Sequence, residues 1–189
     1  MKKMKNLLFI LCLFCLNSCY IRGLQVGYKK VTPENLPLFK FNESKKYLSL
    51  VESNTNDGNI YAVNGNELKE ILKTKEKSII YNWSPFCRSN ACITLNASQK
   101  YCDANGYNLF VVLDYYDALP EAKAPSHKPA YPLLISNHIY YKTGFADKCT
   151  NKFTKDLVGK ENIKSVNYSR FFFFEGDKFV GAKDSLQIK

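Results

Sequence analysis

Two cysteines, Cys87 and Cys92, are the residues of this sequence best suited to chemistry, and four residues separate them. A cysteine thiolate is a nucleophile, and a nearby pair can attack a disulfide and then close one of its own. In a regular helix, residues five apart in sequence have Cα atoms about 8–9 Å apart, whereas a disulfide needs roughly 7 Å or less. A Cys87–Cys92 bridge therefore requires a helix that begins late, with Ser89 or Asn90 as its cap, or one that unwinds.

The elements around the pair alternate between strands and helices. An apolar run predicts a buried strand over 78–83 that leads into Trp83, and a stripe of apolar residues predicts a helix over 91–104. Alternation of this kind indicates an α/β domain with helices on both faces of a sheet. Further strands are expected at 47–52, 59–63, 107–115 and 133–135, further helices near 66–72 and 147–158, and a closing hairpin over 170–181.

A strand that runs into Trp83, followed by the Phe86-Cys87 pair and a helix, resembles the thioredoxin superfamily. It is most similar to the membrane-tethered bacterial members, and the resemblance covers about 59–181. Trp83 and Phe86 match the family's tryptophan and its aromatic residue before the first cysteine. The resemblance implies a thioredoxin-like fold, with a central mixed sheet flanked by helices on both faces, and a hairpin at 171–181 that matches the family's last two strands.

The activity that this resemblance implies is thiol–disulfide exchange without a cofactor. Cys87 would be the attacking thiol, at a helix N-terminus where free amides and the helix dipole stabilise a thiolate, and Cys92 would be the resolving thiol. Besides the wider spacing, two positions depart from the family pattern. Tyr81 stands where thioredoxins bury an acidic residue, and Ser169 stands in the slot of the cis-proline that faces the cysteines, unless Pro132 substitutes for it.

Some peroxiredoxins, which are also thioredoxin-like in fold, place a resolving cysteine five residues after the peroxidatic one. Ser84 and Arg170 match their hydroxyl and arginine positions, so the alternative enzyme is a peroxidase in which Cys87 attacks peroxide and both side chains orient its oxygens. The proline-containing loop that those enzymes carry before the cysteine is missing here. A third hypothesis is a binding protein that keeps the fold and a static Cys87–Cys92 bridge.

Other residues that could do chemistry have simpler explanations. Cys102 and Cys149 lie on apolar helical stripes, which predicts packed thiols or one structural disulfide. The cysteine spacings match no usual zinc pattern, so no metal site is expected. His127 and His138 are interpreted as surface or packing residues, and Asp114, at the end of a strand, as a cap or turn residue.

The N-terminus has the features of a bacterial lipoprotein signal. Lysines precede a short apolar run, too short to span a bilayer, which ends in Leu16-Asn17-Ser18-Cys19 and so resembles a lipobox. The resemblance implies cleavage before Cys19 and lipid on that cysteine, and several acyl chains give stable attachment to a membrane. The expected organisation is a signal peptide over 1–18, a lipidated tether over 19–46 and a thioredoxin-like domain over 47–189.

The composition limits the partners of such a domain. The formal charge of +10 falls to +7 without the three signal lysines, and the remaining lysines are scattered, so nucleic-acid binding is not expected. The expected location is the cell envelope, facing the periplasm, with the outer membrane favoured over the inner. The expected partners are the membrane, through Cys19, and envelope thiol or disulfide proteins. The sequence does not give the oligomeric state.

Overall fold

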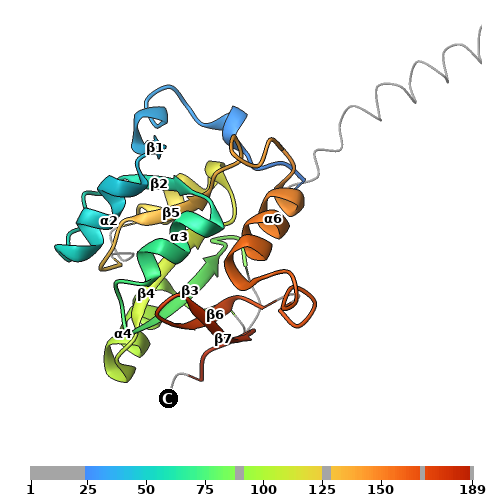
Figure 1. Ribbon diagram of the computed structural model, residues 1–189. Helices are drawn as coiled ribbons and strands as arrows, with labels where there is room; N and C mark the ends of the chain where they lie inside the picture. Colours follow the sequence, from blue (N-terminus) through green and yellow to red (C-terminus); the bar gives the residue numbers. More distant parts are fainter. Residues whose placement is uncertain (1–23, 88–91, 125–128, 167–168, 188–189) are drawn as a thin grey trace, which may run out of the picture.

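The computed structural model describes residues 24–87, 92–124, 129–166 and 169–187 (Figure 1). Within these residues, seven strands form one mixed sheet in the order β1-β2-β5-β4-β3-β6-β7. The first five strands of that order are parallel to their neighbours, whereas β6 is antiparallel to β3 and β7 to β6. The strands are β1 (Phe39–Phe41), β2 (Ile60–Val63), β3 (Lys77–Trp83), β4 (Asn108–Leu113), β5 (Leu133–Ser136), β6 (Phe171–Glu175) and β7 (Lys178–Lys183).

The helices fill the connections between these strands. No described helix is long and apolar enough to cross a membrane. The α-helices are α2 (Ser44–Glu52), α3 (Gly65–Leu72), α4 (Leu95–Asn105), α5 (Leu119–Ala122) and α6 (Ala146–Val158), and the 3-10 turns are η1 (Tyr28–Lys30), η2 (Leu36–Leu38) and η3 (Tyr116–Ala118).

Two consecutive residues of β3 show that helices cover both faces of the sheet. The Tyr81 hydroxyl donates a hydrogen bond to the Ile93 carbonyl (2.9 Å), just ahead of α4, while Asn82 lines a cavity with residues of α6. Neighbouring side chains on a strand point to opposite faces, so α4 and α6 lie on opposite sides of the sheet. Helix α3 packs against α6 (Figure 1). The expected α/β architecture with a mixed sheet is confirmed.

The first described residues correct the expected tether. Instead of an extended linker up to residue 46, Gln25 bridges Phe145, Val26 is buried, and β1 pairs with β2 at the edge of the sheet. Apolar side chains drive this packing, since Val26 and Phe39 enter the common core. Cys19 and residues 1–23 lie outside the described residues.

The segment expected as a strand at 47–52 is instead part of α2. Tyr47 and Val51, four residues apart, are the positions that α2 buries, which is helical and not strand spacing. The Tyr47 hydroxyl donates to the Pro132 carbonyl (3.3 Å), and its ring lies 5.2 Å from that of Tyr61. Burial of one face against β2 thus outweighs the β propensity of these residues.

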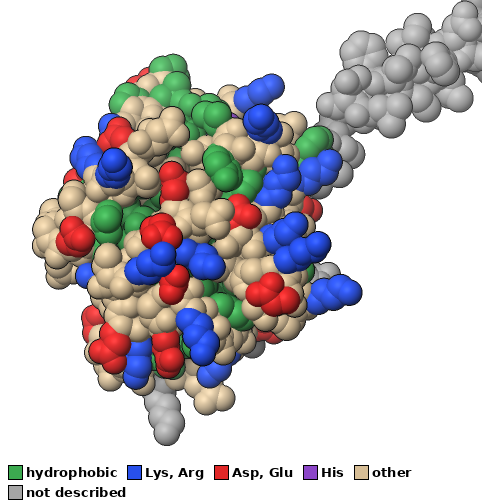
Figure 2. All heavy atoms as spheres, viewed as in Figure 1, with side chains coloured by type: hydrophobic (Ala, Val, Ile, Leu, Met, Phe, Trp, Pro, Cys, Tyr) green, Lys and Arg blue, Asp and Glu red, His purple; other side chains and the backbone are tan. Residues whose placement is uncertain are grey.

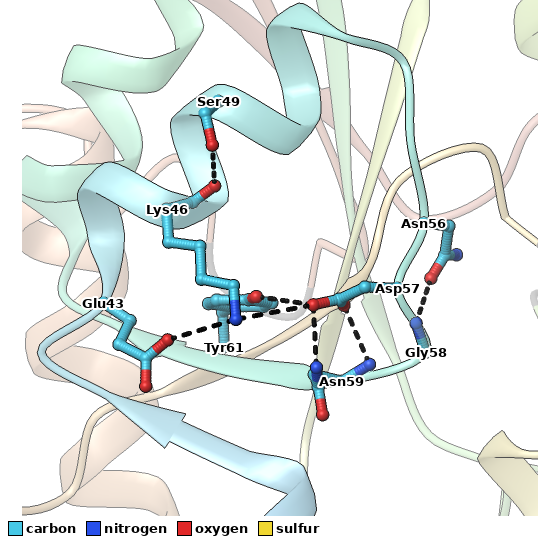
Figure 3. Close-up of polar contacts among 8 residues, drawn as sticks. All are labelled: Glu43, Lys46, Ser49, Asn56, Asp57, Gly58, Asn59 and Tyr61. Atoms are coloured by element: carbon cyan, nitrogen blue, oxygen red, sulfur yellow. Dashed lines mark hydrogen bonds and ion pairs between the residues drawn. The ribbon is translucent and has the colours of Figure 1, made fainter.

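The turn between α2 and β2 is organised around Asp57 (Figure 3). Its carboxylate accepts hydrogen bonds from the backbone and side-chain N–H groups of Asn59 (3.0 and 2.7 Å) and from the Tyr61 hydroxyl (2.8 Å). Burial alone would raise the pKa of Asp57, but these bonds and Lys46 outweigh it, so the pKa is lowered. Next to it, the Asn56 side chain donates to the carbonyls of Pro129 and Tyr131 and so fixes the approach to β5.

Helices α3 and α6 approach each other closely at Gly65. A Cβ at this position would lie 2.5 Å from the Phe153 carbonyl oxygen and 2.8 Å from the Leu157 nitrogen, both of them backbone atoms of α6. Such atoms do not move aside easily, so the absence of a side chain sets the distance between the helices.

We therefore expect Gly65→Ala to destabilise the protein by about 1–3 kcal/mol, the usual cost of overpacking a core. The matched control is Gly181→Ala in β7, where an added Cβ meets nothing within 4 Å. Urea unfolding curves of the two variants and the parent measure the difference. Equal midpoints for the two variants would contradict the close packing of α3 on α6.

Candidate functional site

Cys87 and Cys92 form a disulfide, with Cα atoms 5.9 Å apart. Both precede α4, whose cap is Thr94: the Thr94 hydroxyl accepts a hydrogen bond from the Ala97 N–H (3.2 Å). The helix therefore begins late, as a bridge requires, and later than the expected caps Ser89 and Asn90, which lie outside the described residues. The resemblance implies that Cys87 lies at the N-terminus of this helix, whereas Cys92 is the cysteine closer to the N-terminus of α4.

The residues between β3 and Cys87 form a short turn at the carboxyl end of the strand. Trp83 is buried and ends β3, and the Cys87 N–H donates to the Ser84 carbonyl (3.2 Å). The Phe86 ring lies 6.3 Å from the ring of Tyr115, which follows β4. Trp83, Ser84 and Phe86, selected from the sequence, thus lie together with Cys87 at one edge of the sheet.

Tyr81 supports this turn from the core. Its ring stacks on Phe171 with centroids 4.2 Å apart, and its hydroxyl bond to Ile93 holds the segment between Cys92 and α4. Burial raises the pKa of Tyr81 to about 12, although Arg170 opposes the shift. Tyr81 is therefore neutral at physiological pH and acts on the cysteine segment by position.

A cavity of about 650 Å³ lies at the same edge, between the carboxyl ends of β3 and β4 and the start of α6. This is the edge where open α/β sheets bind ligands. Polar and charged side chains dominate the wall, and a few apolar ones complete it. The lining residues are Asn82, Asp114, Tyr115, Ala146, Asp147, Thr150, Asn151, Thr154, Ile163, Val166, Ser169, Arg170 and Phe172.

Asp114, which follows β4, and Arg170, which precedes β6, line this cavity on either side of β3. The Asp114 N–H donates to the Trp83 carbonyl (3.1 Å), and the Asn82 N–H donates to the Arg170 carbonyl (2.9 Å), so both residues are attached to the last residues of β3. Burial raises the pKa of Asp114 to about 6, against the opposing effect of Arg170. Neither side chain makes a hydrogen bond, or an ion pair within 4 Å, with another described residue.

Asp114 is the residue that sequence reasoning missed, since it was interpreted as a cap or turn residue. Ser169 and Arg170, selected for the sequence alignment, do reach the site region, because β6 pairs with β3. Pro132 does not: it precedes β5, at the opposite edge of the parallel strands from Cys87, and its carbonyl accepts the Tyr47 hydroxyl. The proposed substitution of Pro132 for Ser169 is therefore wrong.

Cys102 and Cys149 are free, buried thiols, so the possible disulfide between them does not form. They belong to α4 and α6, which lie on opposite faces of the sheet. Burial raises the pKa of Cys102 to about 12 and also raises that of Cys149, whose Sγ lies 3.2 Å from Ser136 Oγ. Both thiols are packed and unreactive at neutral pH.

The two histidines lie apart from this site. His138 is half-buried among the rings of Tyr28, Phe41 and Tyr116, and burial lowers its pKa. His127 lies outside the described residues. Among the residues that are described, no group of three or more His, Cys, Asp or Glu side chains could hold a metal ion.

Comparisons with known proteins add no further information about the site: no family model, no curated protein and no solved structure matches this chain.

The raised pKa of Asp114 predicts that its ionisation lowers the stability of the fold. Because the folded pKa of about 6 exceeds the unfolded value of 3.8, folding favours the protonated acid, so stability falls as the pH rises from about 4 to about 6. We expect Asp114→Asn to raise the melting temperature at pH 7.5 and to leave it nearly unchanged at pH 4. Thermal unfolding across this range measures the effect, with Asp103→Asn, at an exposed site on α4, as the control. A pH-independent difference would contradict the assignment.

Proposed function

We propose that this chain is a thiol–disulfide oxidoreductase of the bacterial cell envelope, with a thioredoxin-like fold and a lipid anchor on Cys19. The observation that supports the proposal most directly is the Cys87–Cys92 bridge, which lies in a half-buried turn outside the regular helix. A pair placed there can open and close without breaking the hydrogen bonds of α4. Cys102 and Cys149, by contrast, are buried beyond the reach of a substrate.

The reaction proceeds in two displacements. In the reduced protein, the Cys87 thiolate attacks one sulfur of a substrate disulfide, forms a mixed disulfide and releases the other sulfur as a thiol. Cys92 then attacks Cys87, releases the second substrate thiol and closes the bridge, so two electrons pass from the protein to the substrate. Cys92 lies two residues before the Thr94 cap, and the positive end of a helix favours its thiolate.

The arrangement around β3 is compatible with a thioredoxin-like fold. The order of elements after the cysteines is α4 and β4, and the antiparallel hairpin of β6 and β7 borders the other side of β3. Strand β5 enters the sheet between β4 and β2. It extends the sheet on the side away from the cysteines.

The peroxidase alternative rests on Arg170, which lines the cavity with a guanidinium that no described carboxylate pairs within 4 Å. In that reaction, Cys87 would attack one oxygen of peroxide, which Arg170 and Ser84 orient, and would become a sulfenic acid as the other oxygen leaves as water. Cys92 would then attack the sulfenic acid, close the bridge and release a second water. The binding-protein alternative needs only a bridge that stays closed.

Rates with two oxidants distinguish these functions. With the reduced protein, we expect rapid reaction with a disulfide substrate and a loss of about 100-fold or more in Cys87→Ser, since removing a nucleophile removes its reaction. Cys92→Ser should instead accumulate a mixed disulfide with the substrate, detectable by mass spectrometry. Cys102→Ala, which removes a buried thiol and leaves the pair, is the matched control and should keep the parental rate.

Rapid consumption of hydrogen peroxide that Arg170→Ala abolishes would favour the peroxidase. If neither oxidant reacts above the rate of Cys87→Ser, the enzymatic proposal fails and the binding protein remains.

A further inference from the structure

The cavity beside the turn from Ser84 to Cys87, called the cysteine turn below, is lined by opposite charges. These charges form no ion pair within 4 Å with a described residue. Asp114 supplies a carboxylate and Arg170 a guanidinium, both in the wall, and a second carboxylate, Asp147, is more exposed at the start of α6. The two buried side-chain atoms without partners in the described structure lie elsewhere, on Ser78 and His138. The polar atoms of Asp114 and Arg170 therefore remain accessible to a ligand.

The size and chemistry of the cavity fit a small zwitterion. A volume of about 650 Å³ lies within the usual range of small-molecule sites, roughly 300–1,000 Å³. The planar guanidinium of Arg170 matches a carboxylate, and the carboxylate of Asp114 matches an ammonium group. Thr150, Thr154 and Ser169 also line the cavity and supply neutral hydrogen-bonding groups.

The cavity adjoins the reactive pair. Asn82 lines it and lies in β3, five residues before Cys87, and Tyr115, which also lines it, has its ring 6.3 Å from the Phe86 ring. A small molecule held by its charged end in the cavity thus has its other end near the cysteine turn.

We propose that the cavity binds the amino-acid end of a small zwitterionic disulfide, of the chemical class of cystine, with its carboxylate on Arg170 and its ammonium on Asp114. This deepens the proposed oxidoreductase function and rests on it. The Cys87 thiolate attacks one sulfur of the bound disulfide and releases one aminothiol, and Cys92 then releases the second. One protein dithiol is oxidised and one disulfide is reduced to two thiols.

A series of four symmetrical disulfides tests the charge preference with the reduced full chain. The series is L-cystine (zwitterionic), cystamine (cationic), 3,3′-dithiodipropionate (anionic) and 2-hydroxyethyl disulfide (neutral). Each rate is first divided by the rate of the same disulfide with free dithiothreitol, which corrects for its intrinsic reactivity. The corrected rate is then divided by that of 2-hydroxyethyl disulfide, and this ratio cancels any general loss of folding or thiol reactivity. We expect the highest ratio for L-cystine, by about tenfold, the effect of one good charge-assisted contact of about 1.4 kcal/mol.

Substitution of Arg170 or Asp114 should lower the rate ratios of only those disulfides that carry the opposite charge. Arg170→Gln should lower the ratios of the two disulfides that carry carboxylates and spare cystamine, whereas Asp114→Asn should lower those of the two that carry ammonium groups and spare dithiodipropionate. Lys178→Gln and Asp103→Asn remove the same charges elsewhere and serve as controls. Equal corrected rates for all four disulfides would overturn the inference while the oxidoreductase stands. Reaction with none of them would overturn both.

A different observation carries a second inference. Large apolar side chains are exposed where the described chain begins: Leu24 (50%), Ile139 (57%), Tyr140 (52%) and Phe145 (47%). They belong to two adjoining segments, because the Ala146 N–H donates to the Leu24 carbonyl (3.2 Å) and the Thr143 N–H closes the loop onto His138 (3.2 Å). These four residues are called the apolar face below.

Basic side chains border the apolar face. Lys29, Lys142 and Lys148 are exposed around it, and Lys148 Nζ lies 5.2 Å from the centre of the Phe145 ring. Figure 2 shows Lys and Arg side chains gathered on the part of the surface that α6 occupies in Figure 1. Exposed aromatic and aliphatic groups with lysines around them suit the surface of an anionic bilayer.

The length of chain before Leu24 favours the same partner. Four residues separate it from Cys19, so a lipid on Cys19 keeps Leu24 within about 17 Å of the anchor at full extension. We infer that the apolar face lies against the membrane surface that holds the lipid, which fixes the orientation of the domain. This inference rests on the proposed lipid anchor.

Tryptophan quenching by brominated lipid tests the orientation. Ile139→Trp and Val180→Trp are compared in the lipidated full chain on vesicles containing anionic lipid, since Val180 in β7 is also half exposed (49%, against 57% for Ile139) but lies outside the apolar face. The native Trp83 is buried and gives the same background in both. We expect clear quenching at position 139 only, reduced when Lys142 and Lys148 are both changed to Glu.

The mass of the N-terminal peptide, measured on the same sample, distinguishes a failure of the docking surface from a failure of the lipid anchor. An acylated protein with equal quenching at positions 139 and 180 would overturn the docking surface and leave the anchor in place. A protein without acyl chains on Cys19 would overturn both.

Discussion

Strand β3 is the constraint on which the rest of the site depends. It is hydrogen-bonded on both sides, to parallel β4 and to antiparallel β6, so its position is fixed over nearly its whole length. Two charged residues of the cavity lining are attached to its end, Asp114 through the Trp83 carbonyl and Arg170 through the Asn82 N–H. The cysteine turn is a direct continuation of the same strand. A rigid strand thus sets the positions of two charges and a disulfide that come from three parts of the sequence.

Much of this framework could be predicted from local patterns. The apolar run of 78–83 and the helical spacing of 147–158 agree with β3 and α6 within a residue, because both elements are buried along a continuous stripe or face. The prediction of a strand at 47–52 was wrong, because it relied on the aromatic and β-branched residues of this segment. The four-residue spacing of Tyr47 and Val51 indicated a helix, but the turn-rich residues 54–58 that follow favoured a loop between two strands.

The candidate site was predicted only in part. Local spacing limited the ways in which Cys87 and Cys92 could bridge, and the structure adopts the late helix start. The cap at Thr94 and the strand ends were within the reach of sequence reasoning. The presence of Asp114 and Arg170 in one cavity was not, because it depends on β6 pairing with β3 after a separation of more than eighty residues, and no local pattern encodes that pairing.

The order of the strands has a consequence for how the chain folds. Strand β2 finds no partner toward the centre of the sheet until β5 arrives, about seventy residues later in the sequence, whereas β3 and β4 are joined by a single helix. Contacts between distant segments form slowly, because a long loop must close before they stabilise anything. The pair of β3 and β4 can therefore assemble first. The N-terminal part, up to β2, remains an unfinished edge until the chain has been synthesised or released past Ser136.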